Sequence, residues 1–323
     1  MERVVVTGGC GFVGSHVTKA LLRQGHRVVV LDREPDSTLI EALTGAKDRS
    51  RLEVHNLDVR DRDAVPKAIE GASGVVHLAS LLTQRSDGDP KLAVEVNCLG
   101  AVNVFDAARR AGIARVVWAS STAVYGWGTP GTSVANDAPH TASDIYGRTK
   151  SLTEVIGAQY NRQYAMETVG LRFTVVYGFG RATAIPRGSA GGPVVDLVER
   201  PVAGLKGTRV RHADTVVDWL HVEDAARAVC LALRSDGIES PALSVTGQLA
   251  TLREAAELVR ELVPGVGIDI EPGVSPRPMV MDLDKSAARR EIGYEPAYDL
   301  RAGVAQYIDA LRSARVPAEE QRR

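Results

Sequence analysis

The chain opens with a short β-rich run, a glycine-rich segment and an amphipathic helix in direct succession. Arg3–Thr7 is predicted to be a strand, and residues 12–24 carry apolar side chains such as Val17 and Leu21 at helical spacing. The glycines between them, in residues 7–14, let the backbone turn tightly and approach a pyrophosphate, while the helix N-terminus offers unpaired N–H groups to its charge. This succession predicts a βαβ unit with a dinucleotide-binding loop.

Strand and helix signals continue to alternate through the first half of the chain. Alternation of this kind predicts right-handed crossovers and a parallel sheet with helices on both faces, a doubly wound, Rossmann-like α/β fold. Further strands are expected at residues 27–31, 51–57, 74–79 and 114–121, and helices at 62–70 and 90–111.

The alternation of strand and helix signals becomes irregular after about residue 171. This predicts a smaller substrate-binding domain that is interleaved with the α/β domain of the first half. We expect residues 1–171 to form the nucleotide-binding domain, with parts of 214–247 returning to it, and residues 172–312 to form most of the second. Residues 313–323 are expected to be a disordered tail. In the second half, helices are expected at residues 194–200, 222–234, 252–263 and 300–311, and strands at 208–212 and 243–246.

Composition excludes several classes of protein. The 323 residues include 39 basic and 40 acidic side chains, so neither nucleic acid nor an anionic membrane is an expected partner. No apolar run is long enough to span a membrane. The three cysteines are widely separated, which argues against a disulfide scaffold and against a metal site. We therefore expect a soluble cytoplasmic protein that acts on a small molecule.

Asp32 closes the second predicted strand, where a carboxylate accepts hydrogen bonds from the ribose hydroxyls of a bound dinucleotide. A carboxylate there repels a 2′-phosphate, so the sequence favours NAD over NADP. Arg33 follows directly and could pair with such a phosphate, or simply be a solvated arginine.

Tyr146 and Lys150 lie four residues apart in a predicted helix, so phenol and ammonium project from one face. The ammonium, together with an oxidised nicotinamide, would favour the phenolate and provide a base for a secondary alcohol. Ser121 ends a predicted strand, where its hydroxyl can reach a substrate oxygen. The alternatives are a half-buried tyrosine beside a solvated lysine, and a serine that caps a turn.

At this point the sequence resembles a known family, the extended short-chain dehydrogenases/reductases of the NAD-dependent epimerase/dehydratase kind. Its motifs occur in order over residues 1 to about 312. They are residues 7–14, Asp32, Asp58 with Val59, 77–79 (HLA), Asn97 with Gly100, 120–126 (SSTAVYG), 146–150 (YGRTK), 171–178 (LRFTVVYG) and 218–224 (DWLHVED).

The resemblance implies Tyr146 as acid/base, Lys150 as ribose ligand and pKa modifier, and Ser121 as the hydroxyl that orients the substrate. It also implies a homodimer formed by the helices around residues 90–111 and 144–164. The cofactor-binding residues it implies, together with those of the loop, are Gly8, Gly11, Phe12, Val13, Asp32, Arg33, Asp58, Val59, Leu78, Ala79, Ser80, Asn97, Tyr146, Lys150 and Phe173. Candidate substrate residues are Leu82, Thr83, Ser121, Trp127, Val175 and Arg187.

The sequence also departs from the family pattern. Thr122 and Ala123 stand where dehydratases carry an acidic pair, which disfavours elimination of water. Val175 and Val217 stand where nucleotide-sugar enzymes usually place an asparagine and an arginine that hold the diphosphate. Other side chains could hold it instead, among them Arg187, Arg209, Arg211 and His212.

Three hypotheses follow. The first is an NAD-dependent oxidoreductase acting on a secondary alcohol or ketone of a sugar-like or polyhydroxylated substrate. The alternative is a nucleotide-sugar 4-epimerase, such as a UDP-hexose 4-epimerase, that retains its NAD. The third is an inactive dinucleotide sensor, which the intact set of Ser121, Tyr146 and Lys150 disfavours.

Overall fold

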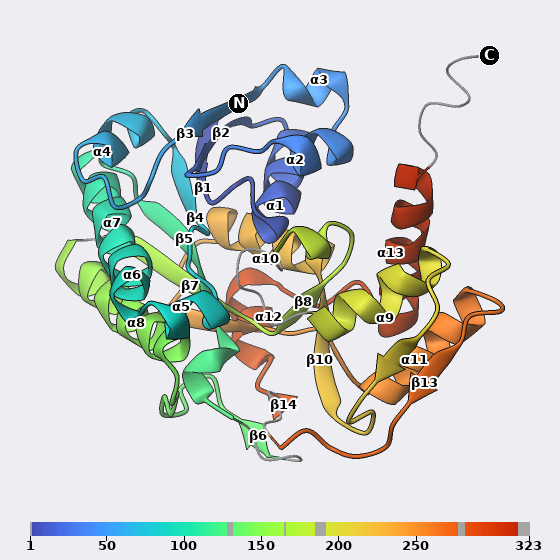
Figure 1. The fold of residues 1–323 in the computed structure, drawn as a ribbon. Coiled ribbons are helices and arrows are strands. Elements are labelled where there is room, and N and C mark those ends of the chain that lie inside the picture. The colour runs from blue at the N-terminus through green and yellow to red at the C-terminus, as the bar shows by residue number, and fades with distance from the viewer. Residues whose placement is uncertain (1, 128–131, 165, 185–191, 277–281, 316–323) are drawn as a thin grey trace.

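A seven-stranded parallel sheet is the centre of the fold (Figure 1). This computed structural model describes residues 2–127, 132–164, 166–184, 192–276 and 282–315. The strands stand in the order β3-β2-β1-β4-β5-β7-β11, so the order reverses between β1 and β4. This confirms the predicted doubly wound, Rossmann-like sheet, and its switch point is where such sheets bind ligands. The bounds are β1 Arg3–Thr7, β2 Arg27–Asp32, β3 Leu52–Asn56, β4 Gly74–His77, β5 Arg115–Ser121, β7 Glu167–Phe173 and β11 Ala242–Val245.

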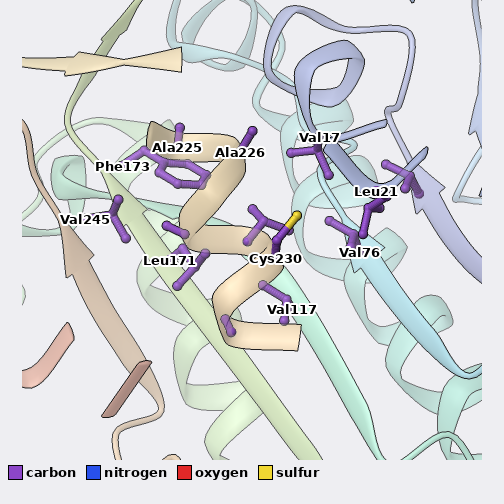
Figure 2. Packing of buried hydrophobic residues seen from close by; sticks show 14 of the residues in the cluster. Val17, Leu21, Val76, Val117, Leu171, Phe173, Ala225, Ala226, Cys230 and Val245 are labelled. Carbon is purple, nitrogen blue, oxygen red and sulfur yellow. The ribbon is translucent and has the colours of Figure 1, made fainter. Parts of the chain in front are cut away.

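Helices cover both faces of this sheet, because its strands are apolar on both sides. Val4 and Val6 face the helices α1 (Phe12–Arg23), α10 (Val222–Arg234) and α12 (Ser286–Ile292), whereas Val5 faces the opposite helices. Figure 2 shows α10 packed between side chains of α1 and side chains of β7 and β11. The opposite helices are α4 (Ala64–Ile69), α7 (Gly100–Arg110) and α8 (Ile145–Tyr164).

A second core lies beside the first, in the C-terminal half of the chain. It centres on a three-stranded sheet of β8 (Val175–Tyr177), β10 (Val216–His221) and β12 (Gln248–Thr251), in the order β12-β10-β8. The buried rings of Tyr177, Trp219 and Tyr307 pack in this core. Its helices are α9 (Gly192–Val202), α11 (Leu252–Leu262) and α13 (Leu300–Arg315). Two strand pairs complete the fold, β9 (Thr208–Val210) with β13 (Ile268–Ile270) and β6 (Ser133–Val134) with β14 (Asp282–Leu283).

The helix predicted over residues 90–111 differs from the observed one. The segment is α6 (Pro90–Val94), a π-helical turn η1 (Glu95–Leu99) and then α7. Hydrophobic spacing does not register the extra residue of a π-turn, although such turns are frequent at functional sites. Six shorter helical segments of the described chain give too little periodicity to be predicted. They are α2 (Thr38–Leu43), α3 (Ala46–Arg49), α5 (Thr83–Gly88), η2 (Thr122–Tyr125), η3 (Arg181–Ala184) and α12.

Two elements extend past residues at which the sequence divides the chain. Strand β7 continues to Phe173, with its residues paired with β5 as far as Ser121, while the division between two domains at residue 171 stays a prediction. Helix α13 continues to Arg315, past the helix end expected at residue 311, so the first residues of the expected tail are helical. Residues 316–323 lie outside the described part of the chain.

Among the described residues, no helix has both the length and the apolar character that crossing a membrane requires. Nor does any group of three or more His, Cys, Asp or Glu side chains within those residues lie in position to hold a metal ion.

Candidate active site

A cavity of about 230 Å³ lies beside α1, at the carboxyl ends of the central strands. Helix α1 begins at Phe12 with Gly11 as its N-cap, and no side chain in the described chain caps it. Its first N–H groups are therefore available to an anion such as a pyrophosphate. Most of the predicted cofactor residues line the cavity, namely Gly8, Gly11, Phe12, Val13, Asp32, Arg33, Asp58, Val59, Leu78, Ala79 and Ser80.

The glycines of the loop are required by close backbone packing. Gly8 has a φ of +68°, and a Cβ at this position would lie 2.6 Å from the Ala79 nitrogen. A Cβ at Gly14 would lie 2.2 Å from the Gly8 carbonyl oxygen. Side chains at either position would push the loop away from β4 or from its own helix, so these glycines shape a cradle that fits a dinucleotide pyrophosphate.

Carboxylates dominate one end of the cavity. The two oxygens of Asp32 accept hydrogen bonds from the Cys10 nitrogen at 3.1 Å and from the Glu34 nitrogen at 3.0 Å. Arg33 forms an ion pair with Glu34, with its Nη2 atom 2.8 Å from Oε1. Arg33 therefore has a carboxylate partner of its own, and the site retains the negative character that disfavours a 2′-phosphate. Asp58 belongs to the same end, where its hydrogen bonds with Arg60 hold the pKa of this carboxyl below its usual value.

Helix α8 brings Tyr146 and Lys150 to the end of β5, where Ser121 lies. The Lys150 ammonium donates to the Ala119 carbonyl oxygen at 2.7 Å, and it lies 5.6 Å from the centroid of the Tyr146 ring. Burial raises the pKa of Tyr146 to about 12, against the opposing effects of a hydrogen bond with Ser121 and the charge of Arg181. Burial also lowers the pKa of Lys150 to about 8.

The phenol is therefore neutral in the free protein, and the expectation that Lys150 and an oxidised nicotinamide together favour the phenolate stays a prediction. The desolvation of a buried phenolate outweighs the neighbouring charges when no oxidised nicotinamide is present. Ser121 caps the turn after β5, one of the two roles that the sequence leaves open, and its contact with a substrate oxygen stays a prediction. Its Oγ interacts with Tyr146 and also accepts a hydrogen bond from the Ala123 nitrogen at 3.1 Å, as a turn cap.

Comparisons with known proteins identify the family of this chain. The model of the NAD dependent epimerase/dehydratase family matches residues 4–245. The chain belongs to this family. Membership confirms the predicted resemblance and NAD as the cofactor.

Curated relatives and solved structures are similar over almost the whole chain. The UDP-glucose 4-epimerase of Mycolicibacterium smegmatis is 30% identical, over 96% of this chain and 99% of its own length. The UDP-glucuronate 4-epimerase 3 of Arabidopsis thaliana is 29% identical, over 94% of this chain and 75% of its own. The solved UDP-glucose 4-epimerase of Thermus thermophilus, a complex with NAD, has a TM-score of 0.80 and 29% identity, covering 97% of this chain and 99% of its own.

Four of the cofactor residues that the family resemblance implies do not line the cavity, namely Tyr146 and Lys150, described above, and Asn97 and Phe173. Asn97, in the π-turn, accepts from the Leu81 nitrogen at 2.7 Å and from the Ser80 hydroxyl at 3.1 Å, and it donates to Thr149. It therefore positions the loop after β4, which does line the cavity. Phe173 is buried in the core shared with α10, as Figure 2 shows.

Two arginines of this family member line the cavity although the sequence did not single them out, Arg85 on α5 and Arg181 on η3. The Arg181 guanidinium lies 5.5 Å from the centroid of the Phe12 ring, and its buried Nε has no hydrogen-bond partner in the described chain. Burial lowers the pKa of Arg181, although its charge still faces Tyr146. The only sequence signal for this residue is its place just after the motif of residues 171–178.

The candidate substrate residues divide into separate groups. Leu82 lines the cavity and Thr83 begins α5 directly after it. Val175 and Val217 are half-buried against the second core, and Trp127 is 42% exposed. Arg187 lies outside the described residues.

Of the other basic residues considered for a diphosphate, two have acidic partners. The Nε atom of Arg209 lies 3.2 Å from carboxylate oxygens of both Asp269 and Glu271, and that of Arg211 lies 3.7 Å from Glu271. These ion pairs leave Arg85 and Arg181 as the better-placed cations for an anion in the cavity.

Proposed function

We propose that this protein is an NAD-dependent 4-epimerase of a nucleotide sugar. The observation that carries the proposal is the meeting of Ser121, Tyr146 and Lys150 beside a cavity suited to NAD, in a chain whose relatives include UDP-glucose and UDP-glucuronate 4-epimerases. The comparisons thus favour the second of the three hypotheses over net oxidation, which the sequence placed first.

In this mechanism the Tyr146 phenolate oxygen takes the proton of the sugar C4 hydroxyl and later returns it. NAD, when bound, supplies the reversible hydride acceptor. The Ser121 hydroxyl donates a hydrogen bond to the same sugar oxygen, and the Lys150 ammonium stabilises the phenolate. Because Tyr146 would return the proton when C4 is reduced from its opposite face, that carbon would be inverted with no net oxidation.

The residues after Ser121 favour epimerisation over elimination of water. Thr122 is buried and its hydroxyl donates to the Phe173 carbonyl oxygen at 3.3 Å, and Ala123 carries no functional group. Neither can act as an acid or a base toward a sugar. This disfavours a dehydratase, although a dTDP-glucose 4,6-dehydratase of Streptomyces niveus is also among the relatives.

The deciding experiment incubates the purified protein separately with UDP-glucose, UDP-galactose, UDP-glucuronate, UDP-galacturonate and dTDP-glucose. Anion-exchange chromatography follows the sugars while absorbance follows NADH. We expect one pair of 4-epimers to interconvert from either side, with no net NADH. The Tyr146→Phe variant serves as the inactive control.

Three outcomes would contradict the proposal. NADH accumulating in proportion to consumed substrate would indicate net oxidation, the first sequence hypothesis. A 4-keto-6-deoxy sugar would indicate a dehydratase. Binding of NAD without conversion of any nucleotide sugar would favour a different substrate class, such as a sugar acid or polyol, or the inactive sensor.

A further inference from the structure

A buried ion pair lies behind the end of β5 and takes no part in the mechanism above. Glu154 on α8 and Arg172 on β7 have side chains that are each 5% exposed. Arg172 donates from Nε to Oε1 of Glu154 at 2.9 Å and from Nη2 to Oε2 at 2.6 Å. Such a bidentate pair has a defined geometry, so it can hold the elements that carry it in one arrangement.

Glu154 continues the row of catalytic side chains on α8. Tyr146, Lys150 and Glu154 are spaced four residues apart, so they lie on one helix face. Each of the three contacts a different residue at the end of β5. Tyr146 interacts with Ser121, Lys150 donates to the Ala119 carbonyl, and Glu154 accepts from the Ser120 hydroxyl at 2.6 Å. The last contact therefore fixes the residue that precedes Ser121.

Glu154 also acts on the charge of Lys150. Burial lowers the pKa of Lys150 to about 8, while the neighbouring Cys98 and then Glu154 act in the opposite direction. The other groups that face Lys150 are Tyr146 on its own helix and His77 on β4. The groups that face Glu154 are Arg172, Ser120, Tyr125 and His140, whose Nε2 lies 3.4 Å from Oε2.

We propose that Glu154 is a positioning residue of the reaction. It holds the end of β5 through Ser120, so that Ser121 keeps its place beside Tyr146, and it supplies the negative charge that accompanies the Lys150 ammonium. The proposal rests on the proposed function only in assigning Ser121, Tyr146 and Lys150 to catalysis.

Two single variants separate these effects. Glu154→Gln keeps an oxygen that can accept from Ser120 but removes the charge. Because Lys150 then loses its proton at lower pH, the alkaline limb of the pH–rate profile should move to lower pH. The loss in kcat should be roughly tenfold above neutrality for each unit of that movement and should vanish in mild acid. Ser120→Ala removes the hydrogen bond but keeps the charge. It should lower kcat about tenfold at every pH with KM unchanged.

The same strands offer a matched control. Glu167 on β7 binds Arg115 on β5 at the opposite end of the sheet, with Arg115 Nε donating at 2.7 Å. Glu167→Gln should lower the melting temperature while leaving kcat and the pH profile unchanged. If Glu154→Gln does not fold, Glu154→Gln with Arg172→Met removes both buried charges. This double variant should show the same movement of the alkaline limb to lower pH, since Arg172 is not among the charges that act on Lys150.

A second readout does not depend on turnover. Titration calorimetry of NAD across the same pH range follows the protonation of Lys150 if its ammonium binds the cofactor. We expect the affinity of Glu154→Gln for NAD to fall at a lower pH than that of the unmodified protein. This distinguishes failure of the proposal from failure of the epimerase assignment. Unchanged pH profiles and kcat in both variants, with only a lower melting temperature, would show Glu154 to be merely structural.

Discussion

Tyr146 illustrates at the scale of one residue how burial and chemistry oppose each other. Its phenol is neutral in the free protein because burial raises its pKa to about 12. We predict that Tyr146→Phe leaves NAD affinity nearly unchanged but lowers turnover by roughly 10²–10⁴-fold, since the ring keeps its packing and only the proton acceptor is lost. Calorimetric NAD titration and the epimerisation assay measure the two effects. Unmodified turnover in the variant would show that another group is the base.

Arg181 is a cation that lines the cavity and that the sequence did not single out. We predict that Arg181→Gln weakens binding of NAD or of the nucleotide sugar by about ten- to a hundredfold, because a charged donor contributes roughly 1.5–3 kcal/mol. Separate titrations with each ligand show which anion it holds. Arg62, whose side chain is 85% exposed, supplies the control Arg62→Gln, expected to bind both ligands normally. Unchanged affinity for both ligands in Arg181→Gln would mean that the guanidinium only packs against Phe12.

Asp32 should determine the choice of dinucleotide. The unmodified protein is expected to bind NAD more tightly than NADP. Asp32→Ala should narrow this difference in affinity, because it weakens NAD binding about tenfold or more and removes a charge that repels a 2′-phosphate. Glu34→Gln should improve NADP binding by releasing Arg33 from its ion pair. Calorimetry with both cofactors tests the pair of variants. A preference for NADP in the unmodified protein would contradict this assignment.

Among the elements, α1 and α10 are joined by a polar contact next to the cofactor helix. Glu223 on α10 accepts from Lys19 on α1 at 2.5 Å and lies 3.4 Å from His16, which also bonds the Phe179 carbonyl oxygen ahead of Arg181. Burial raises the pKa of Glu223, but these hydrogen bonds outweigh it and lower the pKa to about 2. The charged carboxylate therefore stabilises the folded state.

We predict that Glu223→Gln lowers the free energy of unfolding by about 1–3 kcal/mol near neutral pH. A carboxyl whose pKa is depressed on folding contributes its stability above its ordinary pKa of 4.5 and loses it as pH falls toward about 2. The difference in free energy of unfolding between Glu223→Gln and the unmodified protein should therefore shrink as pH falls from 4.5 toward about 2. Urea unfolding at several pH values measures it, with Glu53→Gln on exposed β3 as control. A difference independent of pH would exclude the charge as its cause.

The elements also show why some features could be predicted and others could not. β1, β2 and α1 follow from apolar runs and from glycines, which are local signals. The π-turn that places Asn97 against Leu81 has no such signal, because it depends on packing between η1, α8 and the loop after β4. Arg181 reaches Phe12 only because the fold joins distant segments of the chain. The proposed catalytic residues are recognisable through their motif, whereas the direction of their pKa shifts depends on the buried surroundings, which the motif does not give.

For the whole molecule, the expected homodimer now has a candidate surface. Exposed apolar side chains gather on α6, η1 and α8. They are Val94, Leu99, Leu152, Val155 and Tyr164. Of the large apolar residues on the helices expected to form the dimer, Phe105 is fully buried in its own subunit, while Val94 and Leu152 are exposed. The division into two domains at residue 171 stays a prediction.

We predict that the protein is a dimer at micromolar concentration and that Val155→Asp, at a site 61% exposed, produces monomers. Burying a charge in an apolar contact costs more free energy than the contact contributes to association. Light scattering measures the mass, and Leu205→Asp, on another exposed apolar residue, should remain dimeric. If the unmodified protein is a monomer at this concentration, these residues do not form a dimer contact.

The position of α10 and β11 in the chain has a consequence for synthesis. Helix α10 covers part of one face of the main sheet and β11 is an edge strand of it, but both come well after β7 in the chain. Until they are made, the nascent chain carries six strands with one edge open and part of one face uncovered. Leu171 and Val117 stay accessible to water until α10 packs on them. Products of interrupted translation that end before residue 222 would therefore present an apolar surface to chaperones and proteases. The cofactor half of this protein is finished only when residue 245 has left the ribosome.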